Sequence, residues 1–241
     1  MTAIEWTDTT WNPVTGCTKI SPGCDNCYAE RFSMRFQGVP DHPFESGFEL
    51  TLRPKRLLQP YSWRKPRMVF VNSMSDLFHK DIPKEYIDQV FKTMEACDTH
   101  TFQVLTKRST LLKKYVNDRY KEQPCPGHIW LGVSVETEQQ LSRVAHLANT
   151  NASVRFLSAE PLIGPLHSLK LEGIHWVIVG GESGPKARPM KEEWATQILE
   201  KCIRANVAFF FKQWGGIRPK SGGRVLDGRV WDEFPETSDF G

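Results

Sequence analysis

The sequence predicts an α/β fold of the TIM type: a complete or partial (β/α)6 barrel whose strands all run parallel. The first observation is a series of short, continuous apolar runs rich in β-branched and aromatic residues, which is typical of strands buried on both faces. The second is that segments with apolar residues at helical spacing alternate with these runs, as expected for helices that cover the sheet. The third is their number, because about six such units favour a barrel over an open doubly wound sheet.

The first unit pairs the apolar run 68–72 with a helix that starts near Pro83 and carries apolar residues at helical spacing as far as Met94. The second unit pairs run 102–106 with a helix that contains Leu111 and Val116. The third strand is expected at 129–133, followed by a helix over 136–149. The remaining strands are expected at 154–157, 176–179 and 207–211.

Length and composition place few limits on function. With 241 residues, 39% hydrophobic residues and a formal charge of +3, the chain has the composition of an ordinary globular protein. The first ten residues lack the basic and apolar regions of a signal peptide, and no apolar window is long enough to span a bilayer. We therefore expect a cytoplasmic protein without a membrane partner. We expect residues 1–216 to form the barrel domain and residues 217–241 a glycine-rich hairpin or lid with a tail.

The strongest motif is Cys17, Cys24 and Cys27, spaced C-x6-C-x2-C. A two-residue spacer lets two sulfurs face one metal centre, and Pro22 and Gly23 turn the chain so that the third can join them. Three interpretations are open. The thiols could be buried by chance, they could bind zinc, or they could hold an iron–sulfur cluster with only three protein ligands. Structural zinc takes four ligands, and the sequence contains no second C-x2-C and no H-x3-5-H.

Polar segments follow the predicted strands: SMSD, TKRS, SVET, SAEP and GGESGPKARP. In a (β/α) barrel these segments meet at the rim formed by the carboxyl ends of the strands, where active sites are assembled. We expect the cysteine segment to lie at the same rim. Polar loops are common in α/β proteins, but charged side chains so close to four strand ends indicate a site: Lys107, Glu136, Glu160 and Glu182.

These motifs resemble known families. Three clustered cysteines ahead of a (β/α) barrel are similar to the radical S-adenosylmethionine superfamily. A more specific resemblance is to the phage Gp37/Gp68-like family, a DUF5131-type group with a three-cysteine motif, and the NSMSD, LTK and AEP segments are distantly similar to spore photoproduct lyase. The segments that carry the resemblance run from residue 9 to about residue 216: TTWNPVTGCTKISPGCDNCYAERF, VNSMSDLFH, VLTKR, SVE, SAEPL, VGGESG and FFKQWG.

The resemblance implies a [4Fe–4S] cluster on the three cysteines, with one iron open to S-adenosylmethionine, and an enzyme that generates a 5′-deoxyadenosyl radical. Two departures stand out. The superfamily spacing is C-x3-C-x2-C, and the residue before the third cysteine, usually an aromatic one beside the adenine, is Asn26. Tyr28, which follows the third cysteine, could take the place of that aromatic residue beside the adenine, or it could simply begin a helix.

The resemblance also suggests which strand-end residues bind the cofactor. Asn72, Ser73 and Asp76 would meet its amino group, and Lys107 would pair with its carboxylate. Ser134 and Glu136 would bind the ribose hydroxyls, whereas Glu160 and Glu182 have no defined role there. Each also has a structural interpretation, such as a turn or helix cap for Asn72, Ser73 and Asp76 or a solvated surface position for Lys107.

The proposed enzyme would need a flavodoxin-like or ferredoxin-like electron donor. Its substrate is unknown, and the family resemblance makes nucleic acid or a nucleoside the better candidate. The basic segment 52–67 could contact phosphates or could be a solvated loop. The alternative function is a zinc-binding nucleic-acid or protein interaction module without catalysis.

Overall fold

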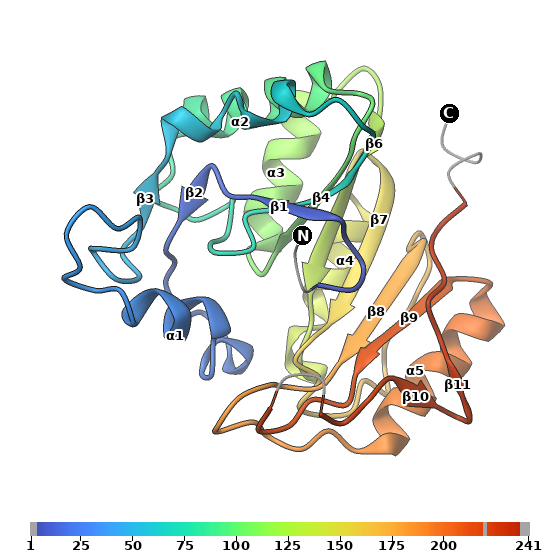
Figure 1. The fold of residues 1–241 in the computed structure, drawn as a ribbon. Helices are drawn as coiled ribbons and strands as arrows, with labels where there is room; N and C mark the ends of the chain where they lie inside the picture. Colours follow the sequence, from blue (N-terminus) through green and yellow to red (C-terminus); the bar gives the residue numbers. More distant parts are fainter. Residues whose placement is uncertain (1–3, 219–220, 237–241) are drawn as a thin grey trace.

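The computed structural model describes residues 4–218 and 221–236, and its centre is a curled parallel sheet (Figure 1). The strand order is β1-β4-β5-β6-β7-β8-β9, with every neighbouring pair parallel. Because β1 and β9 lie at opposite edges, the sheet is a half-barrel, and the predicted partial TIM-like barrel is confirmed. The strands span Thr9–Trp11 (β1), Met68–Val71 (β4), Thr101–Thr106 (β5), Cys125–Ser134 (β6), Ala152–Ala159 (β7), Trp176–Gly180 (β8) and Ala208–Gln213 (β9).

Four helices follow strands of the sheet and pack on its outer face; the sequence predicted three of them, and α5 (Glu192–Ala205) was not predicted. Their buried residues join one apolar cluster with every second residue of the strands. The helix α1 precedes the β4 strand and starts directly after the last clustered cysteine, Cys27. The helices span Tyr28–Met34 (α1), Lys84–Ala96 (α2), Ser109–Arg119 (α3), Ser142–Ala148 (α4) and Glu192–Ala205 (α5).

The inner face of the half-barrel has its own aromatic core. Trp130, Phe156 and Trp176 alternate along their strands with residues that face the helices, and they pack together inside the curl. Gly132 makes room for this packing, because a Cβ atom there would lie 2.5 Å from the ring of Phe156.

The two terminal segments close the amino end of this inner face. The Trp6 and Phe70 rings pack at a tilt with their centroids 4.7 Å apart, and the Phe234 and Trp176 ring centroids lie 5.0 Å apart. Apolar packing therefore fills the concave face near the amino ends of the strands. The polar strand-end residues lie at the opposite edge.

Two small antiparallel ladders flank the sheet. The first joins β2 (Val14–Thr15) to β3 (Thr51–Leu52), and the second joins β10 (Val225–Leu226) to β11 (Arg229–Val230). The second ladder lies within the predicted 217–241 hairpin segment, of which residues 219–220 and 237–241 lie outside the described residues.

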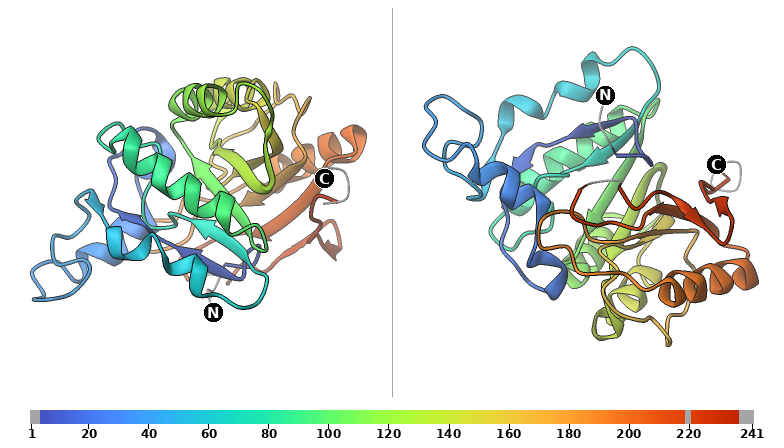
Figure 2. Two further views of the ribbon diagram at one scale, coloured as in Figure 1. Left: turned by 90° about the horizontal axis from the view of Figure 1, so that it is seen from above. Right: turned by 60° about the horizontal axis from the view of Figure 1, so that its bottom comes forward.

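After α1 the chain extends away from the sheet in a loop that ends near Leu50 (Figure 2). Aromatic contacts hold this projecting loop together: Phe36 stacks on His42 at 3.9 Å, and Phe32 meets Phe44 at 5.7 Å. Among the residues that the structure describes, no helix combines the length and the apolar character needed to cross a bilayer.

Candidate functional site

The clustered thiols lie on residues 16–27, which we call the cysteine loop. The loop begins at Gly16, whose φ of +82° is left-handed and whose amide donates a 2.9 Å hydrogen bond to the carbonyl of Met74. A Cβ atom on Gly16 would lie 2.0 Å from the backbone oxygen of Glu49, so only glycine fits there. The three thiols form no disulfide and are half-buried: Cys17, Cys24 and Cys27.

An ion pair between Asp76 and Arg108 holds the start of the cysteine loop. Arg108 Nη1 lies 2.9 Å from Asp76 Oδ2 and donates to Cys17 Sγ at 3.4 Å. Its Nη2 atom donates to both the carbonyl and the hydroxyl of Thr18, each at 3.0 Å. Thr106 Oγ1 donates to Asp76 at 2.6 Å and fixes that carboxylate. The guanidinium thus connects the ends of β4 and β5 to the cysteine loop.

A second ion pair holds the middle of the loop. Glu136, at the end of β6, has no exposed surface, and Arg143 of α4 places Nη1 3.1 Å from its Oε2. Lys107 Nζ lies 3.6 Å from Oε1 of the same carboxylate, and Ser21 Oγ donates to it at 2.9 Å. A Cβ atom on Gly23 would lie 2.3 Å from Glu136 Cγ, so the loop backbone packs directly on this side chain.

A third ion pair holds the end of the loop. Arg188 binds Glu182 through two hydrogen bonds, from Nη2 to Oε1 at 2.6 Å and from Nε to Oε2 at 2.9 Å. Its Nη2 atom also donates to the carbonyl of Pro22 at 2.8 Å. Asn26 Nδ2 donates to Glu182 Oε2 at 2.9 Å, and Arg188 also pairs with Asp25 at 3.2 Å. Burial raises the pKa of Glu182, but the hydrogen bonds from Arg188 and Asn26 outweigh it and hold that pKa below its ordinary value.

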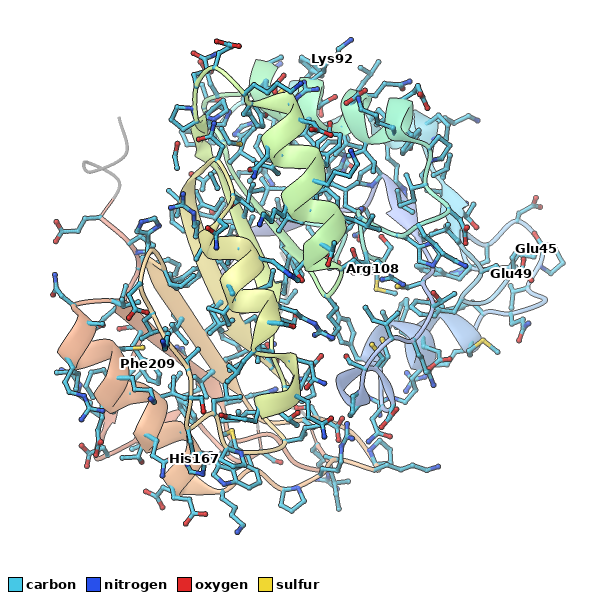
Figure 3. The ribbon with its side chains drawn as sticks, turned by 180° about the vertical axis from the view of Figure 1, so that it is seen from behind. Glu45, Glu49, Lys92, Arg108, His167 and Phe209 are labelled. Carbon is cyan, nitrogen blue, oxygen red and sulfur yellow. The ribbon has the colours of Figure 1, made fainter. Side chains whose placement is uncertain are left out.

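The three carboxylate–arginine pairs fix the cysteine loop against the carboxyl ends of the strands, with one contact beside each cysteine: at Thr18, Ser21 and Asn26. Figure 3 labels Arg108, which precedes the first residue of α3 and reaches Cys17 Sγ at 3.4 Å. Breaking a buried ion pair on one side costs about 3–5 kcal/mol. The predicted position of the loop at the carboxyl rim is therefore confirmed, and the contacts make it a preorganised segment.

The surroundings of two thiols contain hydrogen-bonding groups. Burial raises the pKa of Cys17, the Asp76 carboxylate raises it further, and Arg108 lowers it in part through charge and its hydrogen bond. Ser21 Oγ lies 3.9 Å from Cys24 Sγ. Hydrogen bonds to ligand sulfurs tune iron–sulfur clusters, and Cys17 and Cys24 have neighbours of this kind.

In the described ranges 4–218 and 221–236, no group of three or more His, Cys, Asp or Glu side chains surrounds a position for a single metal ion. The assignment of the three cysteines as cluster ligands stays a prediction.

Tyr28 and Ser73 connect α1 to the end of β4. The Tyr28 hydroxyl donates to the carbonyl of Ser73 at 2.5 Å, although 51% of the tyrosine surface remains accessible. Surrounding protein raises the pKa of Tyr28, and negative charge at Cys27 and Glu160 raises it further. Tyr28 thus lies close to the cysteine loop and to the strand ends, as a cofactor-binding residue must.

Asn72 adopts a left-handed φ of +58° at the end of β4 and is buried. Its Oδ1 atom accepts the amide of Val14 at 3.2 Å, which assigns the orientation of the side-chain amide. Among the described residues, Asn72 Nδ2 has no hydrogen-bond partner. Both N–H groups of this amide are enclosed by protein and unused, which is uncommon for a buried donor.

Glu160 and Ser134 belong to other parts of the rim. Glu160, at the end of β7, pairs with Lys212 of β9, with Nζ 2.5 Å from Oε1. Gly180 of the intervening β8 strand leaves room for this pair, because an added Cβ atom would lie 3.3 Å from the Glu160 carboxyl carbon. Ser134 is buried at the end of β6, and its carbonyl accepts from Arg143 at 2.8 Å.

The structure thus brings Asp76, Glu136 and Glu182 into direct hydrogen-bonded networks with the cysteine loop, and Lys107 reaches it through Glu136. Sequence reasoning missed the groups that complete these networks. Arg108 directly follows Lys107, and Arg188 lies in the same polar segment as Glu182, so both were visible as rim residues. The missed residues are Ser21, Asn26, Arg108, Arg143 and Arg188.

Fold and site together define a class of protein: an α/β half-barrel with a three-cysteine loop anchored at the carboxyl edge of its sheet. A family model described as a protein of unknown function (DUF5131) matches residues 1–235. The chain belongs to this DUF5131 family. No curated protein and no solved structure matches the chain.

Proposed function

We propose that this protein is a radical S-adenosylmethionine enzyme in which Cys17, Cys24 and Cys27 hold a [4Fe–4S] cluster. The observation that supports the proposal best is the cysteine loop: three free thiols on one segment, anchored at the edge where such folds carry their sites by three carboxylate–arginine pairs, two of them buried and the Arg188–Glu182 pair partly exposed. When bound, the cluster and S-adenosylmethionine would supply the one-electron chemistry that yields a 5′-deoxyadenosyl radical. The protein supplies binding, orientation and exclusion of water.

Three thiolates leave one position of a four-iron cluster without a protein ligand, which is what binding of the cofactor requires. Arg108 would donate to the Cys17 sulfur and stabilise its charged form. In this proposal Asp76, Glu136 and Glu182 are positioning residues, since an arginine already engages each carboxylate.

Other strand-end groups then contact the cofactor. The unused Nδ2 donor of Asn72 suits the carboxylate of the methionine part better than its amino group, because the Oδ1 acceptor is already occupied by Val14. The Lys107 ammonium is a second donor for that carboxylate. The remaining candidates are Tyr28, Ser73, Ser134 and Glu160.

A radical enzyme of this kind needs an electron from outside, so we propose a flavodoxin-like or ferredoxin-like donor. The reaction would be of the lyase or transferase type, with nucleic acid or a nucleoside as substrate. The resemblance of the rim segments to spore photoproduct lyase supports this substrate class.

The test is anaerobic reconstitution with iron and sulfide, followed by reduction with dithionite in the presence of S-adenosylmethionine. We expect about four irons per chain, the brown colour of a cluster, and 5′-deoxyadenosine detected by chromatography. Single replacements Cys17→Ala, Cys24→Ala and Cys27→Ala should each abolish product formation. The matched control is Cys97→Ala, which removes a buried thiol beyond the end of α2.

The proposal is wrong if the protein takes up stoichiometric zinc, remains colourless and forms no product. It is equally wrong if the reconstituted, reduced protein forms no 5′-deoxyadenosine although four irons are bound. Unchanged product in the three cysteine variants would contradict the assignment of the ligands.

A further inference from the structure

A cavity of about 640 Å³ lies beside the cysteine loop, between the loop and the amino-terminal turns of α3 and α4. Its volume is that of a small-molecule site. Arg108, which Figure 3 labels, is one of its lining residues. The lining residues come from four segments: Thr18–Ile20, Lys80, Lys107–Leu111, and Ser142, Arg143 and His146.

The charged side chains that line this cavity are basic. Five Lys or Arg side chains line the cavity, and no Asp or Glu does. Three carboxylates pair with lining cations from outside the cavity: Glu30 with Lys19, Asp76 with Arg108, and Glu136 with both Lys107 and Arg143. Five cations against three carboxylates leave an excess of two positive charges, before any charge on His146 is counted.

The polar groups of the lining suit an anion with several oxygen atoms. Hydroxyl groups come from Thr18, Ser109, Thr110 and Ser142, and the Ser109 hydroxyl lies 2.9 Å from His146 Nδ1. Ser109 and Thr110 also form the first turn of α3, an 11-residue helix whose first amide groups carry partial positive charge. Apolar side chains in the lining are few: Ile20 and Leu111.

We infer that this cavity binds a phosphate group, carried either by a free nucleotide or by a single-stranded nucleic acid. A tetrahedral phosphate accepts several hydrogen bonds at once and carries the charge that the excess cations would neutralise. A cation would be repelled, and an apolar ligand would leave the excess positive charge uncompensated. The phosphate would lie next to Thr18, one residue from Cys17.

The inference also names a class of substrate, one that carries a phosphate and binds near the proposed cluster ligands. In that respect it rests on the proposed function. Binding of phosphate itself does not depend on radical chemistry. Binding and 5′-deoxyadenosine formation can therefore be measured separately, and each can fail alone.

A larger cavity of about 1360 Å³ lies between α5 and residues 229–236, at the amino ends of β8 and β9. Its lining mixes cations and carboxylates and includes no residue of the cysteine loop. It supports no comparable assignment.

The experiment compares the reconstituted wild-type protein with Lys19→Gln/Lys80→Gln, which removes two exposed cations from the mouth of the cavity. The matched control is Lys92→Gln, an exposed lysine on α2 that Figure 3 shows far from Arg108. The probes are pyrophosphate, followed by calorimetry, and a fluorescent single-stranded oligonucleotide, followed by anisotropy at several salt concentrations.

We expect at least one probe to bind the wild type and Lys92→Gln equally, and to bind the double variant roughly tenfold more weakly. If the oligonucleotide is the ligand, the slope of log K against log salt should fall by about 2 in the double variant. If pyrophosphate alone is affected, the source is a free nucleotide.

The inference is overturned if neither probe binds, or if the double variant and Lys92→Gln bind both probes equally. If the double variant binds both probes as tightly as Lys92→Gln while 5′-deoxyadenosine still forms, the phosphate site is excluded and the proposed function is not. If the double variant binds a probe more weakly but no 5′-deoxyadenosine forms, the proposed function is excluded and the phosphate site is not.

Discussion

Replacing Glu136 with glutamine tests whether the carboxylate–arginine pairs hold the cysteine loop. The Glu136 carboxylate is fully buried and interacts with Arg143 at 3.1 Å, Lys107 at 3.6 Å and Ser21 at 2.9 Å. Glutamine has nearly the same shape and keeps one acceptor oxygen. The substitution therefore removes a negative charge and disturbs packing little.

The expected loss of stability follows from the two cations left behind. Removing one partner of a buried ion pair costs about 3–5 kcal/mol. The side chains of Arg143 and Lys107 are 10% and 21% exposed, so water reaches both in part. We therefore expect the lower end of the range, about 3 kcal/mol. For a chain of this length that corresponds to a decrease in Tm of roughly 6–12 °C.

The assay is scanning calorimetry of the apoprotein, followed by iron analysis after reconstitution. The matched control is Glu45→Gln, an exposed glutamate on the projecting loop (Figure 3), for which we expect a change within about 0.5 kcal/mol. We expect Glu136→Gln also to bind less iron, because Ser21 loses its charged acceptor and the segment around Cys24 becomes mobile.

A second variant separates loss of the ion pair from general damage. Replacing both partners, as Glu136→Met/Arg143→Met, removes the uncompensated arginine and should be less destabilising than Glu136→Gln. If Glu136→Gln unfolds at the same temperature as Glu45→Gln and binds normal iron, the ion pair does not hold the loop and the reasoning is refuted.

Three further predictions concern the same loop. Gly16→Ala should cost about 1–2 kcal/mol from the left-handed backbone alone, and more from the clash with the Glu49 carbonyl, so calorimetry showing a wild-type Tm would contradict it. The pKa of Glu182 is lowered in the folded protein, so its contribution to stability is present above about pH 4.5 and is lost as the pH falls through the lowered value. Arg188→Met should therefore reduce Tm at pH 7 more than at pH 3, and an equal reduction at both would exclude this linkage. The pKa of Cys17 is raised from 9.0, so alkylation of the apoprotein, followed by mass spectrometry at this residue, should accelerate only above pH 9; rapid alkylation at pH 7 would show that the thiol is already ionised.

Most strands were predictable because each is a continuous apolar run that must be buried on both faces. The run 68–72 became β4 (Met68–Val71), and run 176–179 became β8 (Trp176–Gly180). The β1 strand was missed because Thr9–Trp11 has only three residues and no apolar run, and it exists only because it pairs with β4. Closure of the barrel was left open for the same reason: pairing at sheet edges is a long-range property.

The rim residues were predicted as a group but not by their partners. Parallel strands end at one edge, so Asp76, Glu136 and Glu182 had to lie along the same rim once the sheet was known. The arginine that pairs with Asp76 lies 32 residues further along the chain. The arginines that pair with Glu136 and Glu182 lie 7 and 6 residues further along. No periodicity in the sequence distinguishes these arginines from solvated ones, because the choice of partner depends on how strand ends and loops meet in space.

The sequence by itself determined the alternation of strands and helices, the parallel sheet and the grouping of three cysteines on one segment, because these features depend on local apolar pattern and spacing. Only the tertiary structure decided that the barrel stays half open, that Trp6 and Phe234 fill its amino end, and that three carboxylates hold the cysteine loop. The reason is physical. Ion pairs and edge pairing join residues far apart in the chain, and their energies exist only after folding brings them together and removes water.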